Sequence, residues 1–143
     1  MDLEGGRSTD AVPVAADQVT IIYQPERDGD ADPGEVVWTW VPYEDDPTQG
    51  KDRPVVVLGV AGPDLVVVPM SSQDHDGRRD EAEWVEVGRG QWDRDGRVSY
   101  ADLSRLLRVA PGVVRREGAV LERDDFDRIV HAAREWHPDL QTP

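Results

Sequence analysis

Cysteine is absent from the 143-residue sequence, and long hydrophobic runs are missing as well. Without cysteine there can be no disulfide framework, no thiolate metal site and no cysteine nucleophile, which is typical of proteins of the reducing cytosol. No run approaches the ~18 apolar residues of a membrane span, and the N-terminal stretch MDLEGGRSTDAVPVAADQ lacks the features of a signal peptide. We therefore expect a soluble, cytoplasmic protein without a membrane partner.

Basic residues are scarce. The chain has 16 Lys+Arg against 30 Asp+Glu and a formal net charge of -14, and Lys51 is its single lysine. Nonspecific affinity for nucleic acid comes mainly from neutralising phosphates with Lys and Arg. The composition therefore argues against a protein that wraps nucleic acid through general charge, and any contact with nucleic acid must be local.

The chain divides into an acidic N-terminal segment and one compact domain. Residues 1–32 are mostly small, acidic or proline-bearing and cannot offset the entropy of becoming ordered, so we expect this segment to be largely disordered. Its apolar cluster at residues 19–23 (VTIIY) can add an edge strand. The remaining length and a hydrophobic content of 38% support a single folded domain over residues 33–138.

Short β-type runs bounded by Gly, Pro and Asp follow this segment. Several are continuous runs of β-branched residues, as expected for strands buried on both faces. The turn AGPD makes the second and third runs a hairpin. The last run also fits one face of a helix, but Pro111 cuts it short and favours a strand. The predicted strands span residues 35–41, 53–60, 64–71, 84–87 and 103–109.

A C-terminal helix is predicted over residues 123–136. Four apolar residues recur at i, i+3, i+4 and i+7, and two aspartates stand in the first turn, where the helix dipole favours carboxylates. The apolar positions are Phe126, Ile129, Val130 and Ala133. The sequence thus predicts a mainly β fold with a C-terminal helix, in the form of a small antiparallel barrel.

Arg53 stands where the polar loop PYEDDPTQGKDRP enters a core strand. With the rigid Pro54 behind it, Arg53 should lie at the rim of the sheet. A guanidinium there can direct two donors onto a phosphate or a carboxylate. The alternative is a surface arginine, paired with Asp45, Asp46 or Asp52 in an interaction that contributes little.

A second polar group follows the strand at residues 64–71. Ser71 and Ser72 supply hydroxyls and Gln73 supplies an amide, and such groups at a strand end can hold a phosphate or an unstacked base. The alternative is that these residues only terminate the strand. Neither Arg53 nor this group is specific alone, but together they form a recognisable pair.

These segments resemble the MazF/PemK family of toxin-antitoxin ribonucleases. PGEVVWTWVPYEDDPTQGKDRPVVVLG is similar to the family's opening strand, Gly- and Gln-containing loop and Arg-Pro strand, and VVVPMSSQ is similar to its Val-Pro-x-Thr-Thr-Gln strand end. SYADLSRLLRV and RREGAVLERDDFDRIV resemble the closing strand and final helix. The resemblance covers roughly residues 33–136 and implies an SH3-like barrel.

The resemblance also implies a homodimeric toxin with a cognate antitoxin protein. It would cleave single-stranded RNA without metal or other cofactor and leave a cyclic phosphate and a 5'-hydroxyl. Arg53 falls at the family's catalytic arginine, which stabilises charge on the phosphorane, and Ser71 falls at its catalytic threonine, which orients the phosphate. Thr48 stands where many members have glutamate. The positions implied to contact the RNA strand and its bases are Thr48, Gln49, Gly50, Lys51, Ser72 and Gln73.

Two other hypotheses stay open. The net charge of -14 repels RNA and motivates a catalytically inactive barrel that acts as a protein-binding or regulatory module. A gyrase-poisoning toxin on the same barrel is the other. Cations around Arg53 would favour the nuclease, whereas an acidic surrounding would favour the module. The cations that can flank Arg53 are Lys51, Arg78, Arg79, Arg105, Arg108, Arg115 and Arg116.

Overall fold

The computed structural model describes residues 11–25, 32–43, 46, 48–71, 84–90, 92, 95–115 and 119–141. The strands are β1 (Val12–Pro13), β2 (Thr20–Ile21), β3 (Val36–Pro42), β4 (Gly50–Ala61), β5 (Asp64–Ser71), β6 (Trp84–Gly88), β7 (Ser99–Asp102) and β8 (Leu107–Val109). The helix α1 (Arg123–Trp136) follows them, and two short 3-10 helices span Ala16–Gln18 and Pro111–Val113.

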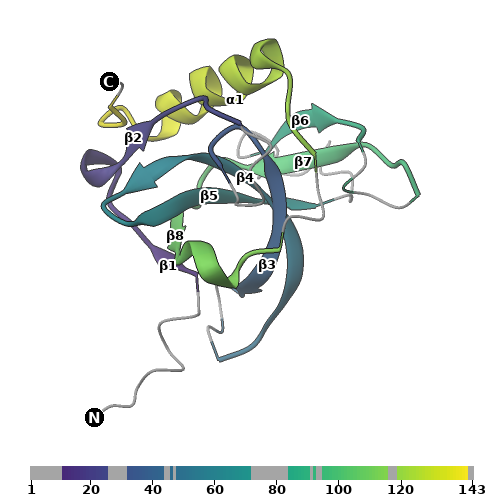
Figure 1. The fold of residues 1–143 in the computed structure, drawn as a ribbon, viewed down its shortest axis with the longest axis horizontal. Coiled ribbons are helices and arrows are strands. Elements are labelled where there is room, and N and C mark those ends of the chain that lie inside the picture. The colour runs from purple at the N-terminus through teal and green to yellow at the C-terminus, as the bar shows by residue number, and fades with distance from the viewer. Residues whose placement is uncertain are drawn as a thin grey trace.

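Antiparallel pairing joins these strands into one sheet with the long strands β4 and β5 at its centre (Figure 1). β8 and β1 continue the sheet beyond β5, while β3 and β2 pair with successive parts of β4. β7 pairs with the end of β5 and carries β6. The prediction of a mainly antiparallel β fold with one C-terminal helix is confirmed. Among the described strands, however, the pairing does not close into a ring, since β1 and β2 end its path.

Two apolar clusters form because successive side chains of a strand point to opposite faces. On β5, Val66, Val68 and Met70 join the cluster beneath α1, which we call the helix-side core. Leu65 and Val67 join the cluster on the opposite face, which we call the second core. All five side chains are buried, and this two-sided burial explains the uninterrupted apolar run in the sequence.

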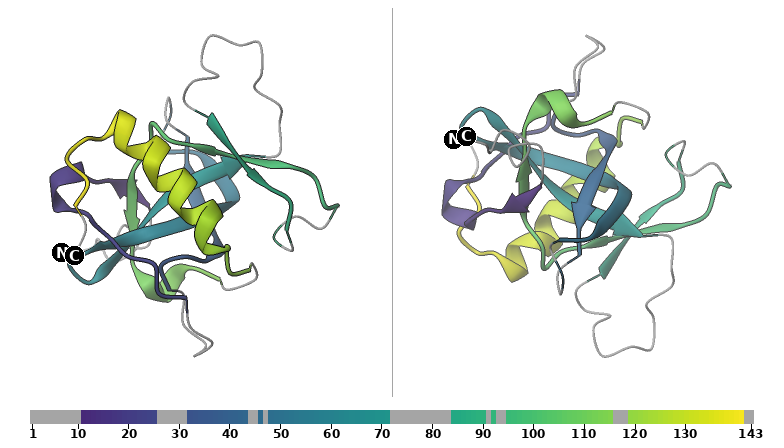
Figure 2. Two further views of the ribbon diagram at one scale, coloured as in Figure 1. Left: turned by 90° about the horizontal axis from the view of Figure 1, so that it is seen from above. Right: turned by 90° about the horizontal axis from the view of Figure 1, so that it is seen from below.

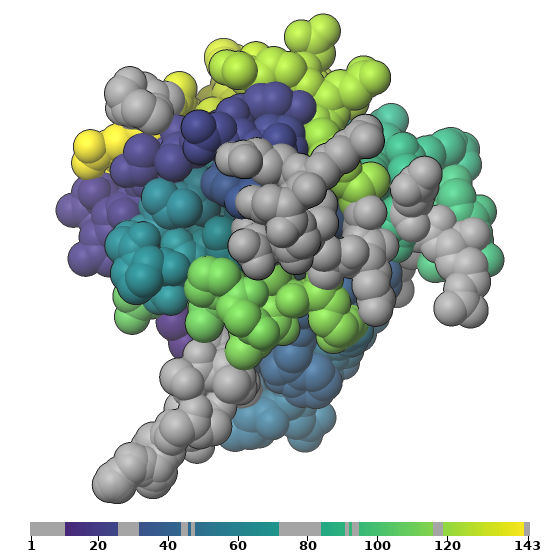
Figure 3. All heavy atoms as spheres, viewed as in Figure 1, coloured from purple at the N-terminus to yellow at the C-terminus, as the bar shows by residue number. Residues whose placement is uncertain are grey.

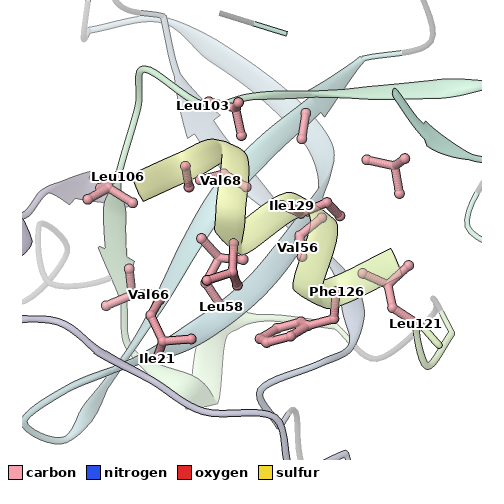
Figure 4. Packing of buried hydrophobic residues seen from close by; sticks show 14 of the residues in the cluster. Ile21, Val56, Leu58, Val66, Val68, Leu103, Leu106, Leu121, Phe126 and Ile129 are labelled. Atoms are coloured by element: carbon pink, nitrogen blue, oxygen red, sulfur yellow. The ribbon is translucent and has the colours of Figure 1, made fainter. Parts of the chain in front are cut away.

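Helix α1 covers the helix-side core, and its bounds agree with the predicted helix. Its buried residues are the four predicted ones, Phe126, Ile129, Val130 and Ala133. Figure 4 shows Phe126 and Ile129 beside Val56 of β4. The amide of His137 donates to the carbonyl of Ala133 at 2.9 Å and ends the helix. In the described part of the chain, no helix has the length and apolar character needed to cross a membrane.

The two faces of the central strands are covered differently. Figure 2 shows α1 lying across the crossing strands β4 and β5, with the β6–β7 ribbon reaching away from them. Among the described residues no α-helix lies over the second core, and Val113 and Val114 pack against it at and after the 3-10 helix Pro111–Val113. Helix α1 therefore lies on the opposite side of the sheet from the second core. The second-core face of β4 and β5 ends in polar residues.

Residues 11–25, which belong to the segment predicted to be largely disordered, carry two short strands that pair with the domain. β1 pairs with β8, and β2 pairs with β4 beyond the end of β3, so the edge strand predicted at residues 19–23 is present in shorter form. Val19 and Ile21 are buried in the helix-side core. The edges of β8 and β4 supply backbone partners that composition does not reveal. Residues 1–10 and 26–31 lie outside the described residues, and their disorder stays a prediction.

The C-terminal segment fastens this N-terminal segment to the domain. The carbonyl of Gln141 accepts the Ile21 amide at 2.7 Å, and the Gln141 amide donates to the Val19 carbonyl at 3.2 Å. Leu140 is buried beside them in the helix-side core. Figure 3 shows the first described residues, in purple, beside the last described ones, in yellow. The two segments thus complete one side of the core together.

The strand predicted at residues 103–109 is also corrected, because the segment contains a turn. β7 ends at Asp102 and β8 begins at Leu107. The Asp102 carboxylate accepts the amide of Ser104 at 3.0 Å and its hydroxyl at 2.7 Å, which stabilises a turn between the strands. Leu103 and Leu106 point into the helix-side core from this turn, so their burial does not require a strand.

We expect Ile21→Ala to lower the free energy of unfolding by about 2–5 kcal/mol, because it removes buried methyl groups from the helix-side core. Val12→Ala is the matched control: Val12 is 38% exposed on β1, and its truncation should cost at most about 0.5 kcal/mol. Urea unfolding followed by tryptophan fluorescence measures both. Equal effects of the two changes would contradict the packing of residues 11–25 described above.

Candidate functional site

Arg53 and Ser71 lie side by side on the central strands. β4 and β5 pair with Val55 opposite Pro69, and one further step of two residues along the same register places Arg53 opposite Ser71. The Arg53 Nη1 donates to the carbonyl of Met70, next to Ser71, in a long hydrogen bond of 3.5 Å. Both side chains are half-buried. Two residues that are distant in the sequence thus form one polar pair.

This pair lies on the second-core face of the sheet, beyond the end of the apolar cluster. Val55 and Val57 on β4 and Val67 on β5 belong to the second core, and alternation places Arg53 and Ser71 on the same face. The polar end of this face is thus supported by a packed apolar layer. Such support fixes the strands that carry the two side chains.

β7 adds two further side chains to this face. Ser71 pairs with Tyr100, and Asp102 lies two residues further along the strand on the same face. Asp102 is only 6% exposed, and its carboxylate holds the turn through Ser104. A buried carboxylate therefore stands close to the Arg53–Ser71 pair.

The guanidinium of Arg53 is partly shielded from water. Burial lowers the pKa of its guanidinium, Tyr43 raises it, Arg105 lowers it further as a like charge, and Asp102 raises it. An arginine stays protonated at neutral pH in spite of such shifts. A partly desolvated cation attracts an incoming anion more strongly than one in bulk water, so Arg53 is suited to binding phosphate.

The sequence did not single out Tyr43 or Asp102, and it offered Arg105 only as one arginine among several. Asp102 is the last residue of β7 and Arg105 lies in the turn after it, and the sequence alone did not show that this strand pairs with β5. Of the other predicted cations, Arg108 lies 3.9 Å from Asp64, and Arg115 forms an ion pair with Asp52. Arg78, Arg79 and Arg116 lie outside the described residues.

The sequence also allowed Arg53 to be a surface arginine paired with a nearby aspartate. The described residues do not support this alternative. Arg53 forms no ion pair with the acids described, since Asp52 pairs with Arg115 and the Asp46 carboxylate accepts from Thr48. Asp45, the third partner considered, lies outside the described residues. Within the described structure, the guanidinium therefore keeps most of its donors for a ligand.

The loop that joins β3 to β4 is held by its own hydrogen bonds. The amide of Tyr43 donates to the carbonyl of Gln49 at 2.8 Å, and the amide of Gln49 donates to the carbonyl of Asp46 at 3.0 Å. The Asp46 carboxylate accepts the amide of Thr48 at 3.2 Å and its hydroxyl at 2.6 Å. The hydroxyl proton of Thr48 is thus used within the loop, while the oxygen can still accept from a ligand.

The remaining predicted contact residues divide into described and undescribed ones. Thr48, Gln49 and Lys51 are exposed on or next to the loop. Gly50 is packed: a Cβ atom there would lie 2.3 Å from the Val41 carbonyl. Ser72 and Gln73 lie outside the described residues, so their expected contact with RNA stays a prediction. The described residues contain no group of three or more His, Asp or Glu that could hold a metal ion.

Residues 32–137 match the family model of the PemK-like, MazF-like toxin of type II toxin-antitoxin systems. The chain belongs to this family. The match contains every residue of the site described above, and it begins near the predicted domain start at residue 33. β1 and β2 precede it, so the sheet of this PemK-like toxin extends beyond the matched range. None of the curated proteins matches the chain.

We expect Gly50→Ala to lower the free energy of unfolding by about 1–3 kcal/mol, because the added methyl group forces the β3–β4 backbones apart. Gly112→Ala is the control, since a Cβ atom at Gly112 meets nothing within 4 Å. Its effect should stay within about 0.5 kcal/mol. Denaturant unfolding measures both, and a Gly50→Ala protein as stable as the Gly112→Ala protein would contradict the tight packing at Gly50.

Proposed function

We propose that this PemK-like, MazF-like toxin is a metal-independent endoribonuclease that cleaves single-stranded RNA, including mRNA. The observation that carries the proposal is that the half-buried Arg53 lies opposite Ser71 at the polar end of the second-core face, with its guanidinium hydrogen-bonded to the Met70 carbonyl. The Arg53 guanidinium and the Ser71 hydroxyl can bind a single phosphodiester between them. They also match the positions that the family resemblance implies.

The proposed reaction uses the RNA as its own nucleophile. The 2'-hydroxyl of one nucleotide loses its proton and attacks the adjacent phosphorus, a new P–O2' bond forms, and the P–O5' bond breaks. The leaving 5'-oxygen takes up a proton, so the products are a 2',3'-cyclic phosphate and a 5'-hydroxyl. Negative charge builds on the nonbridging oxygens in the transition state, and Arg53 stabilises it there. Ser71 donates a hydrogen bond that orients the phosphate before attack.

The local charge supports RNA chemistry despite the acidic total. Arg53 and Arg105 influence each other electrostatically, and Lys51 is exposed two residues before Arg53 on the same face of β4. Asp102 is the acid that acts on Arg53, and its carboxylate is buried and engaged by Ser104. Such a site favours the nuclease over the inactive module. Because few cations contribute, binding should be weak and sensitive to salt.

The β3–β4 loop is the proposed surface for the strand on either side of the scissile bond. Thr48, Gln49 and Lys51 offer an acceptor, an amide and a cation there, and Gly50 lets the two strands approach. We include Ser72 and Gln73 from the sequence alone. The family resemblance further supports a cytoplasmic homodimer inhibited by a cognate antitoxin protein.

The decisive test is cleavage of a long, sequence-diverse single-stranded RNA in excess chelator. Arg53→Ala should slow cleavage about 10²- to 10³-fold, because a donor to the transition-state charge is lost. Ser71→Ala should slow it about 10- to 100-fold, whereas Ser71→Thr should keep near wild-type activity because the hydroxyl is retained. Arg123→Ala, which removes a surface arginine paired with Asp127, is the control.

Two results would end the nuclease proposal: RNA that stays intact with the wild-type protein, or an Arg53→Ala protein that cleaves as fast as wild type. Intact RNA together with growth arrest would favour a gyrase-poisoning toxin. Intact RNA without growth arrest would favour the inactive binding module, which the net charge of -14 supports.

The chemistry of the products gives an independent prediction. RNA in which every 2'-hydroxyl is methylated should resist cleavage completely, because the proposed nucleophile is blocked. Fragments from unmodified RNA should carry 5'-hydroxyls that a polynucleotide kinase can label directly. Fragments that carry 5'-phosphates would instead indicate attack by water and a different mechanism.

A further inference from the structure

A partly buried hydrogen bond links the base of the β3–β4 loop to the turn after β7. The Arg105 Nη2 donates to the carbonyl of Pro42 at 3.0 Å, although the two residues are 63 positions apart in the chain. Pro42 is the last residue of β3 and is itself buried. We call Pro42, Tyr43, Gln49 and Gly50 the loop base, since these residues pair where the loop leaves and rejoins the sheet.

The carbonyl of Pro42 cannot find its partner within the β3–β4 pair. The amide of Tyr43 donates to the carbonyl of Gln49 on the β4 side, and the carbonyl of Glu35 accepts the Val57 amide at the other end of β3. The backbone N–H and C=O groups of the odd-numbered residues of β3 therefore point toward β4, and the carbonyls of the even-numbered residues point away from it. Further back along this edge, the carbonyl of Trp38 accepts the Arg115 amide at 2.8 Å. Arg105 donates a hydrogen bond to the same edge of β3 at Pro42, where the loop begins.

The turn that carries Arg105 is fixed on two sides. The Asp102 carboxylate accepts the amide and the hydroxyl of Ser104, the residue directly before Arg105. On the other side, the carbonyl of Leu103 lies 2.8 Å from the His137 Nε2 just after α1. Leu103 and Leu106 are both buried in the helix-side core. Arg105 therefore extends from a rigid turn, and its hydrogen bond can hold the loop base in place.

We propose that Arg105 is a positioning residue, which ties the loop base to the turn after β7 and so sets the placement of the loop beside Arg53. Its effect on RNA rests on the proposed function, whereas its effect on the loop base does not. Arg105 is also close enough to Arg53 for the two charges to interact. A hydrogen bond from a charged donor to a buried carbonyl is stronger than a neutral one, so its loss should release the loop base.

The first measurement is amide hydrogen exchange of the RNA-free protein. In Arg105→Ala, the amides of Tyr43 and Gln49 should exchange about tenfold faster than in wild type. The amide of Val67 in the second core should keep its protection and so report an intact fold. Arg105→Lys retains a charged donor and should restore most of the protection. Arg108→Ala, which removes an exposed arginine of β8 near Asp64, is the matched charge control.

The second measurement separates positioning from direct contact with RNA. Binding of a random-sequence, fully 2'-O-methylated single strand is followed over a range of salt concentrations. If Arg105 only positions the loop base, Arg105→Ala weakens binding about tenfold without changing the salt dependence. If Arg105 contacts a phosphate instead, the slope of log affinity against log salt falls by about one.

Two results would overturn the inference: unchanged exchange at Tyr43 and Gln49 in Arg105→Ala, or a salt slope that falls by about one in this variant. Faster exchange with recovery in Arg105→Lys supports it even if the wild-type protein cleaves no RNA, in which case only the nuclease proposal fails. With active protein, Arg105→Ala should raise KM about tenfold and leave kcat within about twofold.

Discussion

The antiparallel pairing of β4 with β5 places the groups of the site. Its register brings Arg53 opposite Ser71, and the same strands supply both apolar cores. The hairpin turn at residues 61–64 joins the two strands, with Gly62 at a φ of +61°, where glycine is favoured. A β-bulge between Val57 and Gly59 then shifts the pairing by one residue before it reaches the site. Since a slip of one residue would move every side chain of a strand to the other face, the apolar cores and the polar pair depend on one constraint.

The charge of the site is organised differently from the charge of the chain. An acidic protein with a net charge of -14 cannot attract RNA at long range, but it can bind a phosphate through a few cations in a partly desolvated place. Arg53 is in such a place, with Arg105 near enough to influence its charge and Asp102 buried close by. Surface arginines such as Arg115 are paired with acids instead. Affinity would then depend on the placement of a few groups rather than on total charge.

The agreement between sequence and structure is best where burial is strongest. The predicted strand at residues 64–71 and the predicted helix at residues 123–136 have the observed bounds, because apolar runs and a 3.6-residue period report buried faces directly. β4 begins earlier than predicted, at Gly50, since its first residues are polar and exposed and pair with β3 through backbone groups alone. β1 and β2 are too short to leave a periodic signal.

The sequence by itself determined the long central strands, the C-terminal helix and the acidic character, and it led to the hypothesis that Arg53 and Ser71 act as a pair. Hydrophobic patterns and the order of motifs can be read from the sequence without knowing which residues meet in the fold. Only the tertiary structure decided that Tyr43, Asp102 and Arg105 act on Arg53, and that residues 11–25 complete the core. Those contacts join residues far apart in the chain, and they exist only once strand pairing, register and the packing of turns have fixed which side chains meet.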